Sequence, residues 1–187
     1  MKQKNELKML PDILLKYKAY KILSFLSLYP EKSFYDKEIS ELSGVSRGAT
    51  NQILKSFLET GLVTRERRGK MWLYRITNRP LFKYFRIFEN LVTLSDLVQN
   101  ISPYAKRIIL FGSATSGEDT MESDIDLFII TDKKNDVLEV IRRLESQRKI
   151  SPVIKTPLEY ATEMKKNKVF YSEVSQGIVL HEAKQHE

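Results

Sequence analysis

One short motif constrains this 187-residue chain more than any other feature. An apolar run at 108–111 leads into Gly112-Ser113, and after ten further residues Asp124-Ile-Asp126 opens a second apolar run that ends at Ile130. Short apolar runs bounded by glycine and polar residues are typical of strands buried on both faces. A glycine at a strand end allows a phosphate to approach the backbone, and Ser113 adds a hydroxyl and an amide at a helix start. The motif therefore predicts a phosphate-binding turn beside two carboxylates.

The two aspartates are predicted to point the same way. Side chains alternate between the faces of a strand, so Asp124 and Asp126 share one face. Two carboxylates held this close repel each other unless a cation lies between them, and Mg²⁺ favours such an oxygen site together with substrate phosphates. Two metal ions about 3.5–4 Å apart would activate an attacking hydroxyl and stabilise a leaving pyrophosphate. The expected cofactor is Mg²⁺, with Mn²⁺ as the alternative.

The complete pattern at 110–130, which reads LFGSATSG and then ESDIDLFII, resembles the DNA polymerase β-type nucleotidyltransferase superfamily, particularly the minimal nucleotidyltransferases of bacteria and archaea. The resemblance covers about residues 81–182. It implies a small mixed sheet with flanking helices. It also implies that NTP phosphates bind Gly112 and Ser113, and that the metal ligands and catalytic residues are Asp124 and Asp126.

Two positions depart from the pattern of that family. Active members usually carry a third carboxylate on a later strand, whereas the matching strand here, at 149–156, has no acid. The next acid is Glu159, which would lie beyond the end of that strand. An arginine often follows the Gly-Ser turn, where this chain has Ser116. The connecting loop offers three further acids, which either supply the missing carboxylate or, as we expect, lie in a solvated turn; they are Glu118, Asp119 and Glu122.

The first half of the chain carries all of the positive excess. Residues 1–100 contain 18 basic and 10 acidic residues, a net charge of +8, whereas residues 101–187 contain 13 and 14, a net charge of −1. A basic half is expected where a protein meets a polyanion, although a basic surface without such a partner has the same composition. The predicted elements of this half are helices at 12–28, 36–43 and 46–60 and strands at 62–64 and 71–76, which flank a charged turn at 65–70.

This order, with a glycine turn at Gly44 between the last two helices, is that of a winged helix-turn-helix. Over residues 12–78 it resembles the winged-helix regulators of bacteria and archaea. Leu54 and Phe57 supply the buried side of the 46–60 helix, and Ser46 is its expected N-cap. Its opposite side suits the base edges and phosphates of double-stranded DNA, and the wing tip suits phosphates or the minor groove. The predicted DNA-binding residues are Arg47, Asn51, Gln52 and Lys55 on the helix and Arg67, Arg68 and Lys70 on the wing.

The fold class follows from a change of pattern along the chain. The second half alternates strands, at 108–111, 125–130 and 150–154, with helices at 136–147 and 158–166, after a helix at 81–98. Residues 178–180 are expected to form a short final strand or the end of a helix. We therefore expect an α+β protein of two domains. The first, at 1–79, is a winged helix of three helices and a β-hairpin wing, and the second, at 80–187, is a nucleotidyltransferase-like α/β domain. Trp72 and Phe82 are expected in the core.

Two functions are consistent with these features. In the first, the chain binds DNA and transfers a nucleoside monophosphate from an NTP to a hydroxyl group of an unknown acceptor. In the second, it is a transcriptional regulator whose C-terminal domain binds nucleotide, metal or a protein partner without turnover, because the third carboxylate is missing. A functional acid near Asp124 and Asp126 would favour the first.

The composition excludes several classes of site and of membrane association. The chain has no cysteine, which excludes disulfides and thiolate zinc sites, and its two histidines, His181 and His186, are too few for a histidine-rich metal site. No apolar run approaches the roughly 18–20 residues that span a bilayer, and no signal peptide is recognised. We expect a cytoplasmic protein. If it dimerises on palindromic DNA, the aromatic helix at 81–98 is the expected interface.

Overall fold

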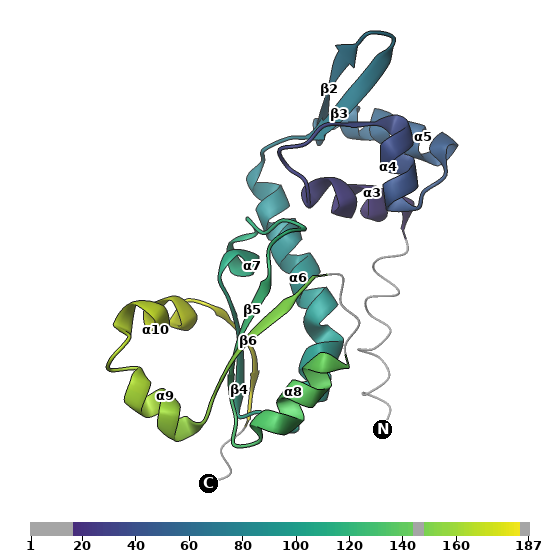
Figure 1. Ribbon diagram of the computed structural model, residues 1–187. Helices are drawn as coiled ribbons and strands as arrows, with labels where there is room; N and C mark the ends of the chain where they lie inside the picture. Colours follow the sequence, from purple (N-terminus) through teal and green to yellow (C-terminus); the bar gives the residue numbers. More distant parts are fainter. Residues whose placement is uncertain (1–16, 144–147, 184–187) are drawn as a thin grey trace. The chain divides into compact units, whose positions relative to one another are not determined.

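The computed structural model describes residues 17–143 and 148–183 and divides into two compact units. Unit 1 is Met1–Glu89 and unit 2 is Asn90–Glu187, so the division falls inside one continuous helix, α6 (Pro80–Ile101) (Figure 1). The boundary expected between residues 79 and 80 lies where that helix starts. Within the described ranges, no helix combines the length and apolar character needed to cross a membrane.

Unit 1 contains the three helices and the hairpin that the sequence predicts. Its elements are α3 (Lys18–Ser27), β1 (Phe34–Tyr35), α4 (Asp36–Ser43), α5 (Arg47–Glu59), β2 (Val63–Arg68) and β3 (Met71–Ile76). The strands form an antiparallel sheet in the order β1-β3-β2, in which the two-residue β1 was not predicted. Residues 12–16 of the first expected helix lie outside the described residues.

The three helices pack around a single apolar core. Its buried residues include Ile22 and Leu26 of α3, Ile39 of α4, and Leu54 and Phe57 of α5. Between α4 and α5, Gly44 has a φ of 66°, the left-handed conformation that glycine adopts without a steric cost. This glycine ends α4 and redirects the chain into α5. Ser46 occupies the N-cap position of α5 as expected, but its side chain does not make the capping hydrogen bond.

The wing differs from the expected charged turn. β2 continues to Arg68, so only Gly69 and Lys70 form the turn, and the prediction for 65–70 is wrong over its first four residues. The predicted core position of Trp72 is also wrong, because this side chain is 39% exposed. The Arg65 guanidinium lies 4.0 Å from the centre of the Trp72 ring, where the ring quadrupole attracts a cation. Phe82 is buried, as predicted.

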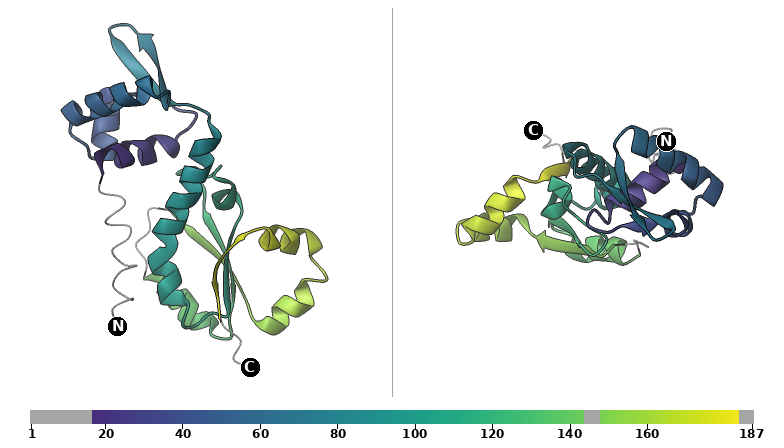
Figure 2. Two further views of the ribbon diagram at one scale, coloured as in Figure 1. Left: turned by 180° about the vertical axis from the view of Figure 1, so that it is seen from behind. Right: turned by 90° about the horizontal axis from the view of Figure 1, so that it is seen from above.

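Unit 2 is built on a mixed sheet of four strands. After α6 its elements are β4 (Arg107–Phe111), α7 (Ser113–Ser116), β5 (Ile125–Ile130), α8 (Lys134–Arg142), β6 (Ile150–Lys155), α9 (Pro157–Glu163), α10 (Lys168–Ser175) and β7 (Ile178–Glu182). The strand order is β6-β5-β4-β7, in which β5 and β6 are parallel and the other pairs antiparallel. The helices α6 and α8 cover one face of the sheet and α9 and α10 the other (Figures 1 and 2). The sequence pattern does not predict α10.

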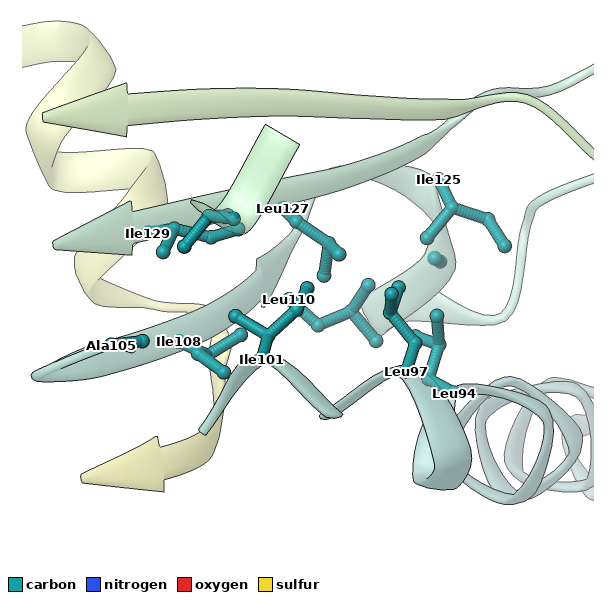
Figure 3. Packing of buried hydrophobic residues seen from close by; sticks show 11 residues of the cluster. Leu94, Leu97, Ile101, Ala105, Ile108, Leu110, Ile125, Leu127 and Ile129 are labelled. Atoms are coloured by element: carbon teal, nitrogen blue, oxygen red, sulfur yellow. The ribbon is translucent and has the colours of Figure 1, made fainter. Parts of the chain in front are cut away.

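Both faces of the central strand β5 are buried. On the α6 side, Leu127 packs with Leu97 and Leu110 in the cluster that Figure 3 shows. On the other side, Phe128 and Ile130 pack against α10. Because side chains alternate, Asp126 points to the same side as Phe128, at the end of the strand where this second cluster stops. The alternation of side chains along β5 thus places the Asp126 carboxylate at the edge of this second apolar cluster.

Candidate functional site

The turn after β4 lies directly against Asp126. Phe111 is paired with Asp126 across β4 and β5, so the following residue, Gly112, leaves the sheet beside this carboxylate. Gly112 has a φ of 72°, and a Cβ atom placed on it would lie 2.7 Å from Asp126 Oδ2. Backbone strain therefore disfavours a side chain here, and any side chain would also displace the Asp126 carboxylate. The structure brings together Gly112 and Asp126, which are 14 positions apart in the sequence.

The short helix α7 starts at this turn. Gly112 is its N-cap and Gly117, with a φ of 68°, its C-cap. The hydroxyl of Thr115 donates a hydrogen bond to the Gly112 carbonyl at 2.7 Å, which fixes the turn from within. Ser113 is the first residue of the helix and is half-buried. The predicted phosphate-binding pair thus lies on an ordered turn beside the predicted metal-binding acids.

The two aspartates interact electrostatically. Both are half-buried. Burial raises the pKa of Asp126, and the negative charges of Asp124 and of Glu173 on α10 raise it further, against a lowering by Lys149 and Arg148. The sequence does not point to Glu173 as a site residue, because this residue lies on α10, which the sequence pattern does not predict. A group whose ionised form is disfavoured in this way gains from a nearby cation, as expected for a metal ligand.

A lysine binds the other aspartate. Lys149 Nζ donates a hydrogen bond to Asp124 Oδ2 at 2.7 Å, and this bond raises the pKa of Lys149. The Lys149 side chain is 74% exposed, so it can leave the carboxylate without disturbing a core. The pair Asp124 and Asp126 fits a divalent ion whose other ligands are phosphate oxygens and water. Across the described ranges, no group of three or more His, Cys, Asp or Glu residues is arranged to hold a metal by protein ligands alone.

The strand next to β5 offers no third acid. Ser151 of β6 lies opposite Asp126, where a neighbouring carboxylate would have to be placed. Glu159 lies beyond the far end of β6, as expected, and forms a capping box with Thr156 at the start of α9. A hydrogen bond from Lys134, followed by one from the Thr156 backbone, lowers the pKa of Glu159 to about 2. Glu159 therefore has a local structural role away from the two aspartates.

The loop between α7 and β5 is only partly the solvated turn that was expected. Glu118 and Glu122 are exposed, in agreement with that expectation. For Asp119 it was wrong: this residue is 2% exposed and is paired with Arg148. Its partner lies 29 positions later in the chain, so no local pattern distinguishes the buried acid from its exposed neighbours.

In unit 1, the predicted recognition residues share the exposed side of α5. Arg47, Asn51, Gln52 and Lys55 are all exposed, whereas Leu54 and Phe57 on the other side are buried. Arg47 Nε donates to Asp36 Oδ2 at 2.9 Å. Burial disfavours the Asp36 carboxylate, but the hydrogen bond and charge of Arg47 outweigh this effect and keep the pKa of Asp36 below its usual value. Asp36 thereby holds the Arg47 guanidinium near the start of α5.

The wing extends the cationic surface. Arg67, Arg68 and Lys70 are exposed on the hairpin, two of them in β2 and one in the turn. Arg67 Nε donates to the Gly69 carbonyl at 3.1 Å, which supports the tight turn. Backbone groups and cations of this kind suit a polyanion.

Most of the second unit matches a known protein family. Residues 94–186 match the family described as Polymerase beta, Nucleotidyltransferase. A threonine–tRNA ligase of Nitrosomonas europaea is 38% identical over 61 residues, which are 30% of this chain and 10% of the ligase; the chain thus spans a small part of that relative. The solved structure of TrmBL2, described as an archaeal chromatin protein with a novel mode of DNA binding, aligns at 14% identity. That alignment covers 88% of this chain and 76% of the other, with a TM-score of 0.32, which is too low to establish a common fold.

Proposed function

Residues 94–186 form a polymerase β-type nucleotidyltransferase domain, and from that premise we propose that the chain transfers a nucleoside monophosphate from an NTP to a hydroxyl group. The observation that carries this proposal is the 2.7 Å approach of a Cβ position on Gly112 to Asp126 Oδ2. A turn suited to phosphate and a carboxylate suited to metal are in contact there.

The chain contributes mainly positioning to this reaction. Backbone amides at Gly112 and Ser113 would bind the terminal phosphates, while Asp124 and Asp126 would hold Mg²⁺ or Mn²⁺ beside them. The bound cation supplies charge neutralisation and a more acidic attacking hydroxyl. The acceptor oxygen forms a bond to the α-phosphorus, the bond to the β-phosphate oxygen breaks, pyrophosphate leaves, and the hydroxyl proton passes to solvent. Lys149 would release Asp124 when the cation binds and would then be free to contact phosphate.

The direct test is label transfer. Purified protein is incubated with α-labelled NTPs and Mg²⁺ or Mn²⁺, with a cell extract as the source of acceptor. Label on an acceptor is expected for the wild-type chain and not for the double variant Asp124→Asn/Asp126→Asn. Transfer by both proteins would show that the two aspartates are not the catalytic centre.

A second function is favoured by one specific observation. β6 carries no acidic residue opposite Asp126, and Lys149 is hydrogen-bonded to the Asp124 carboxylate. A regulator that binds DNA and uses this domain only to bind nucleotide, metal or a partner would need no third carboxylate. Absence of transfer for all four NTPs, together with retained nucleotide binding, would select this alternative.

We also propose that unit 1 binds double-stranded DNA. α5 presents Arg47, Asn51, Gln52 and Lys55 on one exposed side, as a recognition helix in the major groove requires. Asn and Gln side chains match an adenine edge and Arg matches guanine, whereas Lys binds phosphate. The wing would add phosphate or minor-groove contacts. The positive excess of the first half of the chain supports this assignment.

The variants Asn51→Ala and Lys55→Ala are expected to weaken DNA binding in different ways. Loss of a base contact by Asn51→Ala should cost about 1–3 kcal/mol and relax the preference at one base pair. Loss of a phosphate contact by Lys55→Ala should weaken binding to all DNA sequences equally. It should also lower the slope of log K against log salt concentration by about 1. Fluorescence anisotropy at several salt concentrations distinguishes the two.

Lys165→Ala is the matched control, because Lys165 is exposed in unit 2 and its loss changes the net charge equally. It should leave DNA affinity unchanged. Unchanged affinity in Arg47→Ala, Asn51→Ala and Lys55→Ala as well would exclude α5 as the recognition helix.

The homodimer expected from the aromatic helix stays a prediction. Leu81, Tyr84 and Phe88 form a stripe on α6 with exposed fractions of 57%, 71% and 44%. Their spacing places them on one side of the helix. Sedimentation equilibrium of the wild-type chain and of Tyr84→Glu would test whether this stripe contacts a second copy.

A further inference from the structure

A buried ion pair holds the loop that leads to the two aspartates. The side chain of Asp119 in this loop is fully buried, and that of Arg148, just before β6, is 8% exposed. Arg148 Nη1 lies 2.6 Å from Asp119 Oδ2. Burial of two charges carries a large desolvation cost that their mutual attraction often fails to repay. The pair therefore points to a role other than net stability.

Arg148 also binds the backbone next to Asp124. Its Nε donates to the Ser123 carbonyl at 3.0 Å and its Nη2 to the Asp124 carbonyl at 3.4 Å. A guanidinium is planar and presents its donors in a fixed fork, so these bonds fix both the position and the direction of the backbone where β5 begins. The side chain of Asp124 extends from this same backbone.

A fourth partner of Arg148, Asn90, connects the loop to the turn at Gly112 and Ser113. Arg148 Nη1 donates to Asn90 Oδ1 at 3.1 Å, and Asn90 Nδ2 donates to the Ala114 carbonyl at 3.1 Å. Ala114 lies in α7, one residue after Ser113. One buried amide thus links the turn on one side to the aspartate-bearing strand on the other.

We infer that Arg148 is a positioning residue, which with Asp119 and Asn90 sets the distance between Asp124 and the Gly112-Ser113 turn. The inference rests on the nucleotidyltransferase function proposed above. Arg148 acts through the backbone of residues 123–124 and, by way of Asn90, on α7. Outer partners of this kind orient metal ligands, and their loss typically weakens metal affinity by roughly 10- to 100-fold.

The test measures the affinity of the full chain for Mn²⁺ with inorganic tripolyphosphate. This probe has the phosphates of an NTP and no base, so it does not depend on base preference. Arg148→Lys keeps the charge beside Asp119, but a single ammonium lacks the planar fork that reaches Ser123 and Asn90 together. We expect its affinity to fall roughly 10- to 100-fold with a melting temperature close to that of the wild type. Hydrogen exchange of the amides at 119–124 should become faster.

A second variant covers the case in which Arg148→Lys does not fold. Arg148→Met/Asp119→Leu removes both charges, so that no unpaired charge stays buried, and it should fold while losing the same affinity. The control is Arg143→Lys, in which an exposed arginine paired with Glu139 on α8 is changed in the same way. This control should bind as the wild type does.

Each outcome of these measurements either supports or overturns the inference. Wild-type affinity in a folded Arg148→Lys chain, or in the folded double variant, would overturn the inference and leave a purely structural ion pair. A wild-type chain that binds no Mn²⁺-tripolyphosphate would overturn the proposed function, and this inference with it, and this result is visible before any variant is made. Loss of affinity in both Arg148 variants but not in Arg143→Lys establishes the positioning role.

Discussion

Asp126→Asn is expected to lower nucleotidyl transfer by about 100- to 1,000-fold while the chain stays folded. A bound cation stabilises the transition state by several kcal/mol, and loss of one metal-binding carboxylate removes part of this stabilisation. Asparagine has nearly the same shape, so it keeps the contact with Gly112. The rate of label transfer, measured with wild type and variant under the same conditions, gives the factor directly.

The same substitution is expected to leave stability unchanged or to increase it at neutral pH. The pKa of Asp126 is raised in the folded chain by burial and by Asp124 and Glu173. A carboxyl group with a raised pKa favours folding when protonated, and this contribution is lost as the pH rises through the folded-state pKa. The neutral asparagine avoids that loss. Thermal unfolding of Asp126→Asn at pH 7 should therefore give a melting temperature no lower than that of the wild type.

The raised pKa also predicts the acid limb of the reaction. At a metal concentration that does not saturate the site, transfer should fall as the pH is lowered through the pKa of Asp126, at a pH above that of an ordinary aspartate, because protons then compete with the cation for this carboxylate. Asp132→Asn is a matched control, since Asp132 follows β5 but is exposed and paired with Lys106. Activity of Asp126→Asn equal to that of Asp132→Asn would show that Asp126 is not a metal ligand in the reaction.

The sequence predicts best those elements whose pattern is local. The bounds of α4 and β5 are as expected, because eight residues with helical spacing end at Gly44 and six residues start at Ile125 with an unbroken apolar run. The predicted contact between the Gly112 turn and the Asp126 strand follows from the same logic. Two successive buried strands joined by a short connection pair as neighbours, so their polar ends meet.

Other features depend on partners that residue type alone does not reveal. The turn of the wing is two residues long because Arg65 to Arg68 pair with β3, although their composition alone resembles a solvated turn. Asp119 is buried because Arg148 reaches it across 29 positions. Trp72, the one tryptophan in the sequence, is on the surface because Arg65 covers its ring. In all three cases a pairing with another residue overrides the local preference that residue type suggests.

Helix α10 shows a further limit of local patterns. Its eight residues, KVFYSEVS, bury only Tyr171 and Val174, so the sequence gives a weak helical signal. The helix forms because Phe170 packs edge to face against Phe111 and Phe128 of the sheet, with ring centres 5.7 Å and 6.0 Å apart. That packing also brings Glu173 close enough to raise the pKa of Asp126.

Leu127→Ala is expected to destabilise unit 2 by about 2–5 kcal/mol. Leu127 is the neighbour of Asp126 in β5 but points to the opposite face, where its exposed fraction is 0%. It packs with Leu97 and Leu110 between the sheet and α6 (Figure 3). The substitution removes several buried methyl groups and leaves a cavity that a four-stranded sheet covered on both faces closes only in part.

Urea unfolding followed by far-UV circular dichroism measures this loss, while Trp72 fluorescence reports unit 1 separately because the single tryptophan lies there. Val179→Ala is the control, since Val179 of β7 is 44% exposed and its truncation should change the free energy of unfolding by less than about 1 kcal/mol. A loss below about 1 kcal/mol for Leu127→Ala as well would contradict the burial of this face. With the opposite result expected for Asp126→Asn, the two neighbouring residues separate the stabilising face of β5 from its chemical face.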